Sequence, residues 1–222
     1  MSASRAVYDA LVAAILDGRL KPGTRLREAS LASELGVSST PLREALQMLV
    51  HDGLAEHLPG RGVRVVTLSA GDVEEIYDLR AVLEGLAVQL CARKATGRDL
   101  QRLEEVHAQS LELVKGGNLA EYRRCNLALH SLFVEIAGSR RLSHAMAAIR
   151  LQTEFLTSIT VQFPGRPERA VQEHRRIIDA VRRGDGAEAE RVARGHIERA
   201  KEELLAKLGA SDQDLGTGGE VS

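Results

Sequence analysis

One segment of this 222-residue chain, residues 19–64, constrains the fold more than any other. It contains two short helical patterns separated by a glycine turn. Two short apolar runs follow, at 54–57 and 63–67, on either side of a tip formed by residues 59–62 with the sequence Pro-Gly-Arg-Gly. Helix, turn, helix and hairpin is the order of elements in a winged helix-turn-helix. We therefore expect such a domain at residues 1–68.

The helices of this domain are marked by apolar spacing and by turn residues. A helix is expected over residues 4–17, and a second helix is expected to end at Gly36. For the third helix we expect Thr40 as the N-cap and Pro41 at the first helical position, where a missing N–H costs nothing. The third helix should be the one that reads DNA.

Residues 69–208 are helical in pattern almost throughout. Short connections between helices favour antiparallel neighbours, and the low aromatic content of 3% favours aliphatic helix packing. The expected fold class is mainly α, with the winged helix-turn-helix followed by an antiparallel all-α helical bundle. The tail at 209–222 is rich in Gly, Ser and Asp and is expected to be disordered. The six helices are expected near 70–95, 97–115, 118–137, 139–162, 167–183 and 185–208.

Bulk charge does not support DNA binding. The formal net charge is −1, and residues 1–68 hold 8 Lys and Arg against 7 Asp and Glu. DNA binding must therefore depend on where individual arginines lie. No apolar run approaches the length of a membrane span, and neither Cys91 nor Cys125 belongs to a CxxC motif. We expect a cytoplasmic protein, without membrane contact, whose two cysteines are buried thiols.

The candidate DNA-contacting residues lie at the start of the third helix and in the wing. Arg43 is suited to bind guanine O6 and N7 with its forked guanidinium, and Ser38, Ser39 and Thr40 can donate to phosphates. Arg61 at the wing tip is suited to enter a minor groove. The full set is Arg25, Arg27, Ser38, Ser39, Thr40, Arg43, Gln47, Gly60 and Arg61. The alternative is that Arg43 and Gln47 belong to ordinary solvated surface.

Three runs of sequence carry a family resemblance: ILDGRLKPGTRL at 15–26, LASELGVSSTPLREAL at 31–46 and GRGVRV at 60–65. Together they resemble the GntR superfamily of bacterial transcriptional regulators. The helical remainder resembles the FadR-like (FCD) domain of that superfamily, in its six-helix VanR-like variant. The family usually has arginine where this chain has Ser39, so the resemblance does not define the operator sequence.

Three of the seven histidines have a suggestive spacing. His130 lies one helical turn after Asn126, so both share a helix face. His174 is ten residues before Gly184 and His196 is eleven residues after Asp185, which brings them level on two antiparallel helices. Three imidazoles and one amide oxygen can then converge on a metal ion. A single histidine on a helix is more often a polar residue with satisfied hydrogen bonds than a metal ligand.

The resemblance implies the same site. Family members bind a divalent cation with a D-x-x-x-H pair and two later histidines, which match Asn126, His130, His174 and His196. Here asparagine replaces the family aspartate, so the site loses a negative charge and should hold a cation less tightly. Three imidazoles favour zinc or nickel over magnesium or calcium. A histidine-lined pocket without metal is the other interpretation.

Arg80 is the candidate effector-binding residue, because a guanidinium fork fits a carboxylate and the family motif has arginine at this position. The alternative is a simple pair of Arg80 with Glu84 at i,i+4. We expect a ligand-responsive regulator, most simply a repressor, that binds a pseudo-palindromic operator in double-stranded DNA as a homodimer and responds to a small organic acid. Metal as the signal itself is the alternative.

A zinc-dependent hydrolase is the alternative from another class of protein. The sequence disfavours an enzyme, because no glutamate has the HExxH placement of a general base. Glu173 is next to His174 but should point about 100° away from it around the helix.

Overall fold

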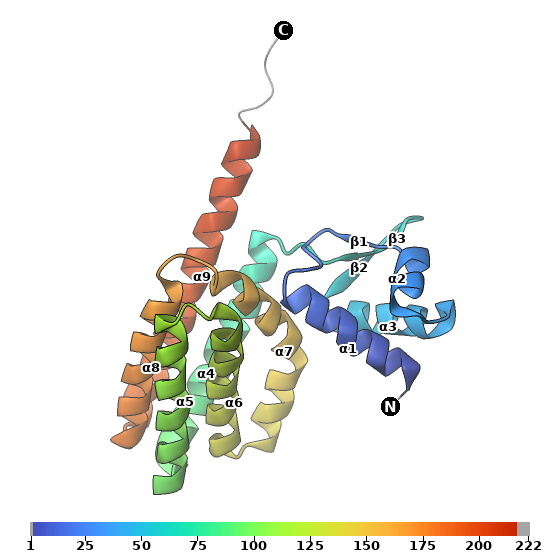
Figure 1. Cartoon of the computed structure of the whole chain (residues 1–222). Helices are drawn as coiled ribbons and strands as arrows, with labels where there is room; N and C mark the ends of the chain where they lie inside the picture. The colour runs from blue at the N-terminus through green and yellow to red at the C-terminus, as the bar shows by residue number, and fades with distance from the viewer. Residues whose placement is uncertain (1, 217–222) are drawn as a thin grey trace. The chain divides into compact units, whose positions relative to one another are not determined.

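The computed structural model describes residues 2–216, with side chains described up to residue 209. This part of the chain contains nine helices and one three-stranded sheet (Figure 1). It divides into two compact units, one of residues 1–68 with 150–158 and one of residues 69–149 with 159–222. The domain limits expected from the sequence, 1–68 and 69–208, stay a prediction. No helix among the described residues is long and apolar enough to span a membrane.

The first unit is a helix-turn-helix with a small antiparallel sheet. Strand β3 is central and pairs with β2 on one side and with β1 on the other, where Arg25 is opposite Arg64. The β2–β3 hairpin agrees with the prediction from the sequence, whereas β1, which has only two residues, was not predicted. The elements are α1 (Ala3–Leu16), β1 (Arg25–Leu26), α2 (Glu28–Leu35), α3 (Ser39–His51), β2 (Ala55–Leu58) and β3 (Gly62–Val65).

The start of α3 differs from the prediction. Ser38 is the N-cap residue, with extended backbone angles, and α3 begins at Ser39 rather than after Thr40. Pro41 is therefore the third helical residue. Its missing N–H is still harmless there, because the N–H groups of the whole first turn lack helical partners. Helix α2 ends at Gly36, as predicted, and this glycine has a left-handed φ of 64°, which is common at helix C-termini.

An apolar stripe on α3 faces the core of the first unit. Leu42, Ala45, Leu46 and Leu49 follow one another at helical spacing and are all buried. The opposite face of α3 is left for solvent or for a partner.

The second unit is a bundle in which α4 is central. It packs along α9, α6 and α8, while α5 packs on α6 and α8 (Figure 1). The main core joins α4, α5, α6, α8 and α9 through aliphatic side chains such as Leu103, Leu129 and Ile177. The helices are α4 (Ala70–Lys94), α5 (Gly97–Lys115), α6 (Leu119–Ala137), α7 (Arg140–Thr160), α8 (Arg166–Arg182) and α9 (Gly186–Gly216).

The end of α9 departs from the expectation. The helix continues to Gly216, whereas we expected disorder from residue 209. A single glycine at 209 costs a helix about 1 kcal/mol, which neighbouring helix-forming residues can offset. Residues 217–222 of the predicted tail lie outside the described residues.

Candidate functional site

The candidate DNA-contacting residues are all exposed in the first unit. Arg25 is in β1, Arg27 is the N-cap residue of α2, and Ser38 is the N-cap residue of α3. The hydroxyl oxygen of Ser38 accepts no capping hydrogen bond from the first turn of α3. The remaining candidates lie on the first turns of α3 or at the tip between β2 and β3: Ser39, Thr40, Arg43, Gln47, Gly60 and Arg61.

Arg43 has an acidic partner that the sequence analysis did not identify. Its Nε donates to Glu28 Oε2 on α2 at 2.6 Å, and both side chains are largely exposed, at 66% and 42%. An exposed ion pair of this kind contributes at most about 1 kcal/mol, so Arg43 can exchange it for a base or phosphate at small cost. Glu28 also lowers the local positive charge when no DNA is bound.

The second unit brings three buried histidines together. Each of His130 on α6, His174 on α8 and His196 on α9 offers one ring nitrogen, and these three atoms lie within 4.8 Å of one another. The ring centroids are 4.6 to 5.4 Å apart. None of the three residues is more than 9% exposed. The convergence predicted from the spacing is therefore present, and we refer to these residues as the histidine cluster.

Two buried carboxylates orient the rings of this cluster. Glu84 on α4 accepts from Nδ1 of His130, and Glu173 on α8 accepts from Nδ1 of His196 at 2.5 Å. An ionised carboxylate only accepts, so both Nδ1 atoms carry the hydrogen. The Nε2 atoms are left facing the cluster. Nε2 of His196 lies 3.3 Å from Nε2 of His174, and Nε2 of His130 has no hydrogen-bond partner among the described residues.

Two arginines keep these carboxylates ionised. Arg80 Nε donates to Glu84 at 2.6 Å, and Arg166 Nη1 donates to Glu173 at 3.0 Å. Burial by itself raises the pKa of Glu84, but the charges of Arg80 and His130 outweigh it and hold that pKa well below its usual range. Burial also raises the pKa of Glu173, and the hydrogen bond from His196 with the nearby cations brings it down to about 2.

Two members of the histidine cluster are neutral near pH 7. Burial lowers the pKa of His174 well below its usual range, and the neighbouring His196 and His130 lower it further. Burial also lowers the pKa of His196, to about 4, although the hydrogen bond to Glu173 acts in the opposite direction. A neutral ring is the form that binds a metal ion, because its unprotonated nitrogen supplies the lone pair.

The histidine cluster fits an imidazole-bound divalent cation. A tetrahedral ion with metal–nitrogen bonds of about 2.0–2.1 Å separates its nitrogens by about 3.3–3.4 Å, which the His174–His196 pair already matches. Carboxylates on the outer ring nitrogens are the usual second layer of such sites. Asn126 is buried one turn before His130 on α6. The donor set is therefore three imidazoles, the ligand type that suits zinc or nickel.

The two carboxylates were not identified as site residues from the sequence. Glu84 was considered only as an i,i+4 partner of Arg80, and that pair is present and almost fully buried. Glu173, which was expected to point away from His174, forms an ion pair with His196 on the next helix. It also accepts from Arg166 and Arg199. A carboxylate so occupied is unsuited to act as the general base of a hydrolase.

We predict that the histidine cluster makes the folded chain less stable as the pH falls. The pKa values of His174 and His196 are lower in the folded chain than in the unfolded chain, so the unfolded chain binds more protons below pH 6.5. In chelator-stripped protein, the free energy of unfolding should fall between pH 6.5 and 4 by on the order of 1–3 kcal/mol. Urea unfolding at several pH values measures this slope. His174→Gln should flatten it, whereas His144→Gln, on an exposed position of α7, should not. Equal slopes in both variants would contradict the assignment.

Comparisons with known proteins agree with this architecture. The chain is 32% identical over 198 residues to the HTH-type transcriptional regulator YdhC of Bacillus subtilis, covering 89% of this chain and 88% of that protein. It is 32% identical over 195 residues to a protein of Paenarthrobacter nicotinovorans described as a transcriptional repressor of a D-xylose utilization operon, covering 86% and 84%.

Solved structures give the same result. A GntR regulator from Rhodococcus sp. RHA1 is similar with a TM-score of 0.79 and 28% identity, covering 93% of this chain and 99% of that chain. Escherichia coli McbR/YncC shares the fold with a TM-score of 0.78 at 21% identity, covering 94% and 99%.

The family comparison covers both units. Residues 3–65 match the bacterial regulatory proteins of the gntR family, and residues 75–199 match the FCD domain. These families and relatives are transcriptional regulators and not enzymes, as the sequence analysis expected. The chain therefore belongs to the GntR family of bacterial transcriptional regulators, in the group that carries a C-terminal FCD domain.

Proposed function

We propose that this regulator binds a pseudo-palindromic operator as a homodimer. A small organic acid that binds at the histidine cluster then lowers or raises the affinity for the operator. The observation that carries the proposal is the pairing, in one chain, of an exposed face on α3 with a buried histidine cluster in which His174 and His196 are neutral near pH 7. Because the DNA of a bacterium is in its cytoplasm, we place the protein there.

The first turns of α3 supply the base contacts in this proposal. Arg43 and Gln47 are one turn apart on the exposed face of α3, while Ser38 and Ser39 are at its N-terminus. Hydroxyls and free N–H groups at that end favour phosphate, and the arginine favours guanine. Arg61 at the wing tip adds a cation for the adjacent minor groove. Since the first unit is almost neutral overall, two such units in one dimer are needed for useful affinity.

An apolar stripe on α4 is the proposed dimer interface. Leu79, Val82 and Leu86 are 54%, 48% and 39% exposed, although they belong to the central helix of the bundle. Their spacing of three and four residues puts them on one face, opposite the buried Arg80 and Glu84. A two-fold pairing of this stripe with itself would cover it and match the symmetry of the operator.

The effector is proposed to bind at the histidine cluster, through a metal ion when one is present. A cation held by three neutral imidazoles keeps its positive charge and attracts a carboxylate. Arg80 is 4% exposed and donates to Glu84, so it acts in the first place by holding the glutamate that orients His130. Direct contact of Arg80 with the effector remains part of the proposal. A metal ion as the signal itself is the second candidate. It is favoured because Glu84 and Glu173, the carboxylates next to the histidine cluster, are already paired with arginines.

We predict that Arg43→Ala weakens operator binding by about tenfold or more and relaxes selection at one base pair per half-site, because a forked guanine contact is lost. The operator is first selected from a random DNA library, and affinities are measured by fluorescence anisotropy at fixed salt. The matched control is Arg19→Ala, which removes an equally exposed cation outside α3. Unchanged affinity and sequence preference in Arg43→Ala would contradict this role.

Asn126→Asp is expected to raise zinc affinity by about tenfold or more, because a carboxylate oxygen replaces a neutral amide oxygen beside the histidine cluster. Competition with a chromophoric chelator, on untagged and metal-stripped protein, measures the change. Asn118→Asp is the control, since Asn118 is the N-cap residue of α6 and lies outside the cluster. Native mass spectrometry gives the metal content per chain. Equal affinities in the two variants would refute the proposed ligand.

Val82→Glu should convert the dimer to a monomer, because it puts a charge at the centre of the apolar stripe on α4. Sedimentation velocity measures the mass of the species. Leu111→Glu on α5 is the matched control, since Leu111 is 38% exposed but outside the stripe, and it should leave the dimer intact. A dimeric Val82→Glu variant, or a monomeric wild type, would reject this interface.

A further inference from the structure

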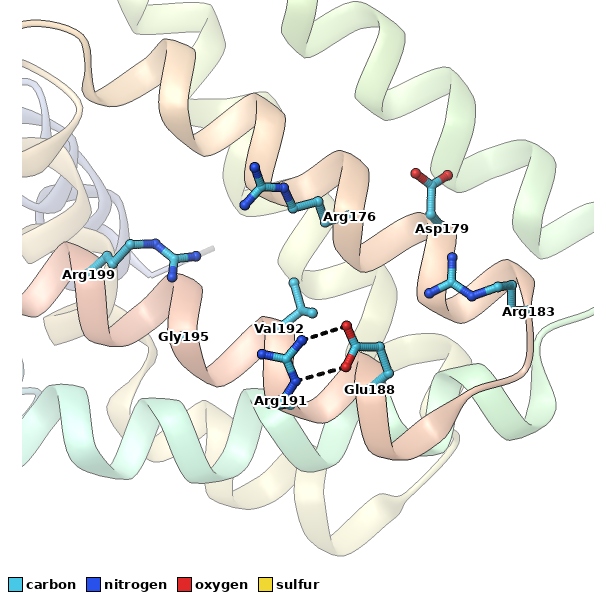
Figure 2. Close-up of a pocket in the computed structure, with 8 residues that line it drawn as sticks. All are labelled: Arg176, Asp179, Arg183, Glu188, Arg191, Val192, Gly195 and Arg199. Carbon is cyan, nitrogen blue, oxygen red and sulfur yellow. Dashed lines mark hydrogen bonds and ion pairs between the residues drawn. The ribbon is translucent and has the colours of Figure 1, made fainter.

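A groove rich in arginine lies on the outside of the bundle, between α8 and α9. Figure 2 shows Arg176 and Arg183 on α8 and Arg191 and Arg199 on α9. The groove has a volume of about 280 Å³, which suits a small molecule rather than a polymer. Its lining also includes Asp179 and Glu188. We refer to it as the arginine groove.

The two carboxylates of the arginine groove are already engaged. Glu188 accepts a two-point hydrogen bond from Arg191, at 2.6 and 2.8 Å (Figure 2). Asp179 pairs with Arg175 at 2.9 Å and with Arg182 at 3.3 Å, and neither of these arginines lines the groove. Asp179 therefore contributes little negative charge toward the arginines on the groove side.

Two arginines of the groove are left without a carboxylate. Among the residues that the structure describes, neither Arg176 nor Arg183 has an acidic partner within ion-pair distance, although many other exposed arginines of the bundle do. Arg183 acts on Glu188 only through its more distant charge. The floor of the groove at Gly195 has no side chain, and a Cβ there would lie 3.2 Å from Nη1 of Arg199. Unpaired guanidinium groups around an open floor are suited to an anionic ligand.

The arginine groove is connected to the histidine cluster by one side chain. Arg199 is 45% exposed on the groove side, and its Nε donates to Oε1 of Glu173. The other oxygen of Glu173 accepts from Nδ1 of His196. An anion that attracts Arg199 therefore competes with Glu173 for the same guanidinium. When Arg199 moves, Glu173 loses one of its donors and its hydrogen bond with His196 changes.

We propose that the arginine groove binds a small molecule carrying at least two phosphate or carboxylate groups, separately from the histidine cluster, and that Arg199 transmits its binding to His196. Two anionic groups are required because one is to pair with Arg176 and Arg183 on α8 while the other reaches Arg199 on α9. The groove is thus a second ligand site in the same unit, and the chain would respond to two ligands.

Calorimetric titration with inorganic pyrophosphate and with citrate tests the first part. The protein is stripped of metal, dialysed free of chelator and held at constant ionic strength, because a chelator is itself a polycarboxylate. We expect saturable binding of one probe per chain. Tighter binding of pyrophosphate would assign the site to phosphate esters, and tighter binding of citrate would assign it to polycarboxylates.

A pair of double variants makes this test specific. Arg176→Gln with Arg183→Gln should weaken the binding of the probe by about tenfold or more, because two charge-assisted contacts are lost. Arg140→Gln with Arg141→Gln removes the same charge from exposed positions of α7 and should change affinity by less than about twofold. Circular dichroism checks that both variants are folded. No saturable binding at millimolar probe, or an equal loss in both double variants, would overturn the site.

A separate measurement tests whether Arg199 transmits binding in the arginine groove to His196. Nitrogen-15 spectra of the histidine rings report the hydrogen bond at Nδ1 of His196, with the signal assigned through His196→Gln. A probe concentration that saturates wild type should shift this signal in wild type and in the Arg140/Arg141 variant, and should shift it much less in the Arg176/Arg183 variant, which binds the probe more weakly. Binding of the probe without any shift at His196 would overturn the role of Arg199. Neither readout depends on DNA or on zinc.

Discussion

The structure of the second unit depends on the mutual compensation of buried charges around three imidazoles. Arg80, Glu84, Arg166 and Glu173 are each no more than 6% exposed, and each cation faces an anion. Removing one partner of such a pair typically costs about 3–5 kcal/mol, since the other is left buried and uncompensated. These pairs come from α4 and α8, and the rings that they hold come from α6 and α9. The histidine cluster therefore fixes four helices at once.

The same compensation explains what the cluster can bind. A histidine whose Nδ1 donates to a carboxylate has one orientation and one tautomer, so Nε2 is presented as an acceptor before any ligand arrives. Two of the rings are kept neutral by burial. Neutral rings alone do not attract anions, and in the proposed function a bound cation would supply the missing charge. An aspartate in place of the proposed ligand Asn126 would cancel part of that charge.

Local sequence signals predicted much of the fold and part of the site. Helix positions followed from apolar spacing and glycine breaks, and the level placement of His174 and His196 followed from their equal distance to one turn. Partners from other helices could not be predicted in this way. Glu173 bonds across to α9, and Arg43 bonds across to Glu28 on α2, and both contacts depend on helix packing. Strand β1 was missed because two residues show no alternation.

Helix α4 has a buried ion pair on one face and an exposed apolar stripe on the other, and its first turn is held by a capping box. Ser69 and Asp72 cap its first turn reciprocally, and Val66 just before it is tied to Leu54 by a backbone hydrogen bond of 3.0 Å. Only Thr67 and Leu68 lie between these two fixed points. Backbone rotation between the first unit and α4 is therefore confined to Thr67 and Leu68, and the hydroxyl of Thr67 itself donates to Glu56 of β2.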